Sequence, residues 1–95
     1  MGTFTGKFAS GAKVAVQGLY SGAFYIKAQG AVYAASGSCE LVSGKKAKFR
    51  MVFDDDASYV LTGTITRAQN GSRTMNALEL KRGKVIDKLS LSAVR

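Results

Sequence analysis

The stretch KAKFRMVF, residues 46–53, alternates strictly between apolar and cationic side chains until its last two positions. Side chains at positions i and i+2 of a β-strand lie on the same face of the sheet. Phe49 and Met51 would therefore share one face, whereas Lys48 and Arg50 would lie on the other. This pattern predicts an antiparallel strand with one buried and one solvated face.

Similar alternation extends in both directions from this stretch. The segment 58–67 is rich in β-branched residues, which suit a pleated sheet, and it places Tyr59, Leu61 and Ile65 on one face. Further strands are predicted at 4–8, 14–20, 24–28, 31–35, 39–41, 73–81 and 85–94. The chain therefore contains eight or nine short strands and no clear helix.

The alternation slips within residues 73–81. Met75 and Ala77 lie on one face, but Leu78 and Leu80 lie on the other. A β-bulge shifts the facing of a strand by one residue. A bulge near Asn76 or Ala77 would bring all these apolar side chains to one face, and we predict it there.

Three five-residue segments, at 4–8, 16–20 and 61–65, place a glycine between apolar residues on one strand face. Glycine weakens a strand unless the sheet bends sharply or another backbone approaches closely. Gly6, Gly18 and Gly63 therefore predict a strongly curved sheet.

Turns separate the predicted strands at short intervals. Asn70-Gly71 is a strong hairpin signal, predicting a type I′ turn in which both central residues have positive φ. Other turns are expected at 10–11, 21–22, 29–30, 36–37, 43–44 and 82–83. The spacing predicts a small all-β antiparallel meander, either a curled barrel or a two-layer sandwich.

The 95 residues, 46% of them hydrophobic, fit one domain spanning 1–95 with a single core. Cys39 is the only cysteine, and its apolar neighbours Leu41 and Val42 predict a small buried side chain rather than a nucleophile. No signal peptide and no apolar run of about 18 residues is visible, so we expect a cytoplasmic protein that does not engage a membrane.

The formal net charge is +8, and it is uneven. Residues 1–50 carry seven Lys/Arg and one acid, a net of +6, whereas residues 51–95 carry seven and five, a net of +2. A positive field of this size favours polyanionic partners and also keeps a small protein soluble.

Several kinds of catalytic site lack the residues they need. The chain has no histidine, which removes the commonest general base and transition-metal ligand. The run Asp54-Asp55-Asp56 lacks the spacing of a calcium loop and predicts a charged turn. Glu40 and Glu79 fall on strands, where either could pair with a cross-strand Lys or Arg. We expect no enzyme activity, no metal and no cofactor.

Basic side chains form two groups in the sequence. On one strand face, alternate cations lie about 6.7 Å apart, close to the phosphate spacing of an extended single strand. Such a track, joined by exposed aromatic residues, is typical of single-strand binders, although a charged face can also serve only to prevent edge pairing. The predicted nucleic-acid contacts are Lys45, Lys46, Lys48, Arg50, Lys81, Arg82, Lys84 and Lys88.

Residues 23–36 are apolar on both faces except for Lys27 and Gln29. A strand with two apolar faces is either central in a sheet or covered by a partner. The residues proposed for such an interface are Phe24, Tyr25, Ile26, Val32 and Tyr33.

These patterns predict a non-enzymatic module that binds a polyanion, most readily nucleic acid, on a basic strand face. One alternative is a protein–protein module, whether an assembly subunit, a homo-oligomer or an inhibitor, that uses the 23–36 surface. Another is a barrel that holds a small apolar ligand, which an interior filled by Phe4, Phe8, Phe49, Phe53 and Tyr59 would argue against.

Overall fold

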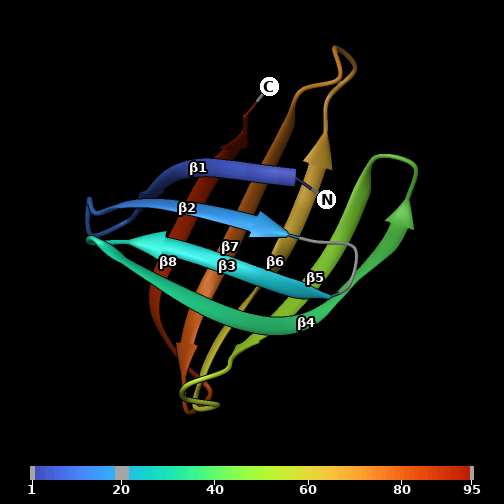
Figure 1. Ribbon diagram of the computed structural model, residues 1–95. Helices are drawn as coiled ribbons and strands as arrows, with labels where there is room; N and C mark the ends of the chain where they lie inside the picture. Colours follow the sequence, from blue (N-terminus) through green and yellow to red (C-terminus); the bar gives the residue numbers. More distant parts are fainter. Residues whose placement is uncertain (1, 19–21, 95) are drawn as a thin grey trace.

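Eight antiparallel strands follow one another along the chain in the computed structural model, which describes residues 2–18 and 22–94 (Figure 1). Each strand pairs with the next, and β8 pairs with β1, so the sheet closes into a barrel. The strands are β1 (Gly2–Phe8), β2 (Lys13–Gly18), β3 (Ala23–Ala28), β4 (Ala31–Ser43), β5 (Lys46–Phe53), β6 (Tyr59–Arg67), β7 (Arg73–Lys81) and β8 (Lys84–Ala93). The predicted all-β meander is confirmed, in its barrel form.

In the barrel, β1–β4 cross in front of β5–β8 at a steep angle (Figure 1). Apolar side chains from both groups meet between them. The largest fully buried ones are Phe4, Val16, Phe24, Ile26, Met51, Leu61, Met75 and Leu91. The centre of the barrel is therefore a packed core. Within the described residues, no helix is long and apolar enough to cross a membrane.

Glycines allow neighbouring strands to approach closely at three positions on the barrel wall. A Cβ on Gly63 would collide with the backbone oxygen of Asn76 and lie 2.7 Å from the Cα of Ala77. Gly6 meets the backbone of Ser90 and Leu91 on β8 in the same way. The predicted role of Gly6 and Gly63 in sheet curvature follows from these approaches, because any larger residue would force the strands apart.

The third such glycine is Gly37, where an added Cβ would lie 2.7 Å from the Cα of Met51. The sequence predicted a turn at Ser36-Gly37, and this prediction is wrong, since β4 runs through both residues. A close strand approach and a turn both select glycine, so the two are hard to tell apart in sequence. Gly18, the other predicted position, is buried at the end of β2, and Leu19 and Tyr20 lie outside the described residues.

The predicted bulge near Asn76 or Ala77 is also wrong. The pairing of β7 with β6 is regular along all of β7, and the irregularity lies between β7 and β8, where Glu79 pairs with Asp87 but Leu80 pairs with Val85. Leu78 and Leu80 therefore keep the outer face of the barrel. Glu79, in register with the buried Leu61, keeps the inner face.

Where the structure describes them, the hairpin turns are mostly where they were expected, but one has another geometry; Ser21 of the turn expected at 21–22 lies outside the described residues. At Asn70-Gly71 only Gly71 has positive φ, so the predicted type I′ turn is absent. The loop is longer, with Ala68 donating its backbone N–H to the Ser72 oxygen at 2.8 Å. Two consecutive residues of positive φ occur instead at Gln29-Gly30 and Arg82-Gly83, as a type I′ turn requires.

Cys39 was predicted to be buried, but its side chain is exposed. Pairing of β4 with β3 ends at Ser36, whereas β4 continues to Ser43 alongside β5. Over this extension no described strand covers the second edge of β4, which also leaves Leu41 82% exposed.

Candidate functional site

The outer face of the barrel carries a row of polar side chains in register across five strands. Lys7 on β1 pairs with Ser90 on β8, and Ser90 with Asn76 on β7. Asn76 pairs in turn with Thr64 on β6, and Thr64 with Lys48 on β5. The row therefore begins and ends with a lysine and has neutral polar groups between.

A second row lies beside the first. Lys88 on β8 pairs with Leu78 on β7, Leu78 with Thr62 on β6, and Thr62 with Arg50 on β5. Neighbouring strands are about 4.8 Å apart, so the three steps from β8 to β5 separate the cations by about 14 Å along the sheet. The arrangement is two cationic borders with an uncharged floor.

This surface is hollowed into a shallow groove of about 970 Å³. We call it the basic groove and define it by its cations Lys7, Lys48 and Lys88, with Arg50 next to Lys48 on the same border. Its floor is formed by Thr62, Thr64, Asn76, Leu78 and Ser90. Gly6 and Gly63 also line it, so the close strand approaches that bend the sheet underlie the hollow.

No carboxylate lines the basic groove among the described residues. Its three lysines are exposed, and with no acidic residue in the lining they make the groove electropositive. The Thr62 hydroxyl donates a 3.2 Å hydrogen bond to the backbone oxygen of Phe49. The other floor hydroxyls and the Asn76 amide supply neutral hydrogen-bonding groups. The groove can therefore accept anionic oxygens at its borders.

The structure brings together only part of the predicted basic set. Lys48 and Lys88 line the groove and Arg50 lies next to Lys48 on β5, whereas Lys45 and Lys46 lie at the β4–β5 turn. Lys81, Arg82 and Lys84 lie at the β7–β8 turn, at the opposite end of the strands. The two predicted groups therefore do not merge into one patch.

Lys7 belongs to the groove but was missing from the predicted set. Its outward direction could be predicted from the glycine-centred segment 4–8, because Phe4, Gly6 and Phe8 face inward. Its neighbours could not be read, since β1 joins β8 only through closure of the barrel, across most of the chain length.

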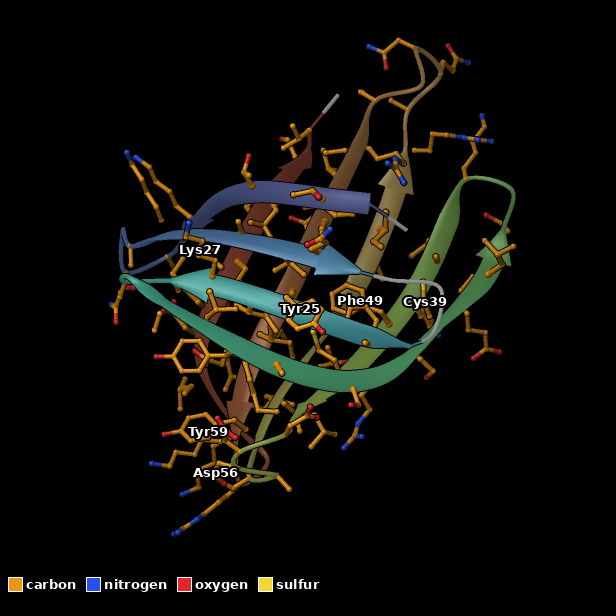
Figure 2. The ribbon with its side chains drawn as sticks, viewed as in Figure 1. Tyr25, Lys27, Cys39, Phe49, Asp56 and Tyr59 are labelled. Carbon is orange, nitrogen blue, oxygen red and sulfur yellow. The ribbon has the colours of Figure 1, made fainter. Side chains whose placement is uncertain are left out.

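Phe24 and Ile26 from the predicted interface point inward, and each is 2% exposed. Tyr25 and Val32 face outward, and Figure 2 shows Tyr25 on the outside of β3. Tyr33 lies near the end of the barrel and packs edge-to-face against Phe53. The apolar character of residues 23–36 thus arises largely from the core, because β3 contributes its inner face to it.

An apolar guest at the centre of the barrel would meet a filled interior. Phe4 and Phe49 are buried there, and Phe8 and Phe53 pack against the core that they belong to. The run Asp54-Asp55-Asp56 forms the β5–β6 turn, as expected, with Asp56 accepting hydrogen bonds from the Ser58 hydroxyl and backbone N–H. These hydrogen bonds lower the pKa of Asp56. Within the described ranges, no three acidic or cysteine side chains are placed to hold a metal ion.

Comparisons with known proteins add no further constraint on the site. No protein-family model, no curated protein and no solved structure matches this chain.

Proposed function

We propose that this protein is a non-enzymatic module that binds single-stranded nucleic acid along the basic groove. The observation that carries the proposal is the placement of Lys7 and Lys88 along one border and of Lys48 and Arg50 along the other, on either side of an uncharged floor. The borders are about 14 Å apart between Lys88 and Arg50 and about 19 Å apart between Lys7 and Lys48, which gives room for one extended strand lying along β6 and β7.

The groove favours contacts with the phosphate backbone. Of the aromatic residues that line it, Phe49 is buried and Phe8 packs partly against the core, so among the described residues neither offers an open ring face for a base, and Tyr25 lies on β3, away from the groove. Single-strand binders that read no sequence combine a cationic groove with stacking surfaces, and only the first component is present here. We therefore expect modest affinity, little sequence preference and strong salt dependence.

The salt dependence gives a quantitative test. Each phosphate neutralised on a single strand contributes a slope of about −0.7 to the plot of log K against log salt. Four groove cations therefore predict a slope of about −2.8. Fluorescence anisotropy of a labelled oligonucleotide, titrated with protein between 20 and about 200 mM salt, measures both affinity and slope.

Two double variants with equal loss of charge separate the groove from the net charge. Lys48→Gln with Lys88→Gln should reduce the slope by about 1.4 and the affinity by roughly tenfold at 50 mM salt. Lys45→Gln with Lys84→Gln removes two charges outside the groove. This variant should keep most of the wild-type affinity and most of the wild-type salt slope. Equal losses in the two variants, or no binding at low salt, would refute the proposal, and preference for a duplex oligonucleotide would refute its single-strand form.

A further inference from the structure

One end of the barrel contains a recess of about 410 Å³. The β1–β2, β3–β4, β5–β6 and β7–β8 turns gather at this end, because strands of a meander reverse direction at each step. The volume lies within the range of small-molecule sites, roughly 300–1,000 Å³. This end recess shares only Phe8 with the lining of the basic groove.

Aromatic rings form much of the recess wall. Phe53 lies between Tyr33 and Tyr59, with ring centroids 6.2 and 6.3 Å apart and interplanar angles of 85° and 88°. Phe8 also lines the recess. In edge-to-face contacts neighbouring rings are nearly perpendicular, so the group presents ring faces in different directions. Ring faces carry negative electrostatic potential and attract cations.

The charged side chains that line the recess are all acidic. The chain has six Asp and Glu residues, and four of them, Asp55, Asp56, Glu79 and Asp87, line this recess, whereas no Lys or Arg of the described residues does. Figure 2 shows Asp56 and Tyr59 together at this end of the molecule. In a protein of net charge +8, most of the acidic side chains therefore gather at one recess, with Lys81 and Arg82 near enough to act on Asp56.

Two of these carboxylates lie directly opposite one another on the inner face. Glu79 pairs with Asp87 across β7 and β8, an arrangement that is destabilising when both are ionised. Asp87 accepts a 3.0 Å hydrogen bond from the Ser10 hydroxyl. No hydrogen bond to Glu79 is found among the described residues. The described part of the chain contains no buried side-chain oxygen or nitrogen that lacks a hydrogen-bond partner. Since Glu79 lines the recess, its carboxylate oxygens are therefore accessible there.

The chemistry and size of the recess define its occupant. The carboxylates are too dispersed to converge on a metal ion in the described structure. Aromatic faces combined with carboxylates match an organic ammonium group, which is bulky, poorly hydrated and positively charged. We propose that the end recess binds a small organic ammonium ligand, held by Tyr59 and Phe53 and neutralised by Glu79 and Asp87.

Lys81 lies at the rim of this recess. Its Nζ is 5.1 Å from the centroid of the Tyr59 ring, so one ring at this end already attracts a cation. Lys81 also lowers the affinity of the recess for an incoming cation by repulsion. We expect Lys81→Met to bind an ammonium ligand more tightly than wild type does.

Choline and its neutral isostere 3,3-dimethylbutan-1-ol test the proposal with the full chain. Amide chemical shifts are followed by NMR at low salt during titration with each compound. Choline should saturate and shift residues of the recess, with at least tenfold higher affinity than the isostere. Equal affinity for choline and the isostere would show that the recess binds apolar groups without regard to charge. Chemical-shift changes outside the recess, or the absence of saturation, would show that the recess is not a binding site. Any of these results would overturn the proposal.

Variants distinguish binding from folding. Glu79→Gln should weaken choline binding about tenfold although it removes a repulsive pair and so stabilises the fold. Glu40→Gln removes the same charge on β4, away from the recess, and should leave binding unchanged. Tyr59→Leu should also weaken binding, with Tyr25→Leu as its control on the outer face. Equal effects of Glu79→Gln and Glu40→Gln would overturn the proposal.

Discussion

Gly63 shows how one missing methyl group shapes this barrel. Its backbone pairs with Phe49 on β5 and Ala77 on β7, and the β7 backbone occupies the space that a side chain would need. The obstacle is main chain on a neighbouring strand, which cannot move aside as the end of a flexible side chain can. Gly63 therefore contributes to both the curvature of the wall and the shape of the basic groove.

We predict that Gly63→Ala lowers the free energy of unfolding by about 3 kcal/mol or more, and that Gly63→Val prevents folding. Chemical denaturation followed by circular dichroism measures the loss. Gly44→Ala is the matched control, since a Cβ there meets nothing within 4 Å, and its effect should stay within about 0.5 kcal/mol. A stable Gly63→Val variant would show that the wall can open without loss of the fold.

The pairing of β7 with β8 decides the electrostatics of the barrel end. It sets Glu79 opposite Asp87, whereas Glu40 on β4 faces Lys48 on β5. From the sequence, we predicted that either glutamate could pair with a cation on a neighbouring strand. In the structure Glu40 has such a cation opposite it, whereas Glu79 does not. Burial, followed by the negative charge of Asp87, raises the pKa of Glu79.

This pKa shift predicts a pH dependence of stability. Because Glu79 binds a proton more readily in the folded state, its ionisation costs stability as pH rises from its ordinary range near 4.3 through its raised pKa. The free energy of unfolding of Glu79→Gln should therefore exceed that of wild type by roughly 0.2–1 kcal/mol at pH 7. At pH 3, where the Glu79 carboxyl is protonated, the two proteins should be equally stable. Denaturation at both pH values measures this. A variant less stable than wild type at pH 7 would mean that the carboxylate is favourably paired.

Closure of the sheet is the property of the whole molecule that distinguishes it from a sandwich. β1 pairs with β2 on one side and with β8 on the other, so neither terminal strand is left as an open edge. Unpaired edges are sites of fraying and of association with other chains. The closed sheet holds Lys7 beside Lys88 and also brings the Ser10 hydroxyl to Asp87.

We predict that amide protons in the β1–β8 pairing exchange with solvent as slowly as those between β6 and β7. Both sets are internal to the closed sheet and should open only with global unfolding. Hydrogen–deuterium exchange followed by NMR measures the two rates in one sample. Much faster exchange of the β1–β8 amides would indicate that the barrel opens locally at its closure.

The candidate groove illustrates what could be predicted from sequence and what could not. The outward direction of Lys48, Arg50 and Lys88 follows from alternation within single strands. Their assembly with Lys7 requires the pairing of β1 with β8, which joins residues from opposite ends of the chain. The alternation of residues 73–81 slips at Leu78, and we predicted a bulge just before it. The strand instead continues without a bulge against β6, so Leu78 faces outward and Glu79 faces inward.

The sequence by itself determined that the chain is an all-β meander, where most of its strands lie and which side chains share a face, because these properties depend on a period of two residues and on local turn residues. Only the tertiary structure decided that the sheet closes, that Gly37 continues a strand and that two acidic side chains meet inside one end. These depend on register between strands, and register is set by packing among residues distant in the chain.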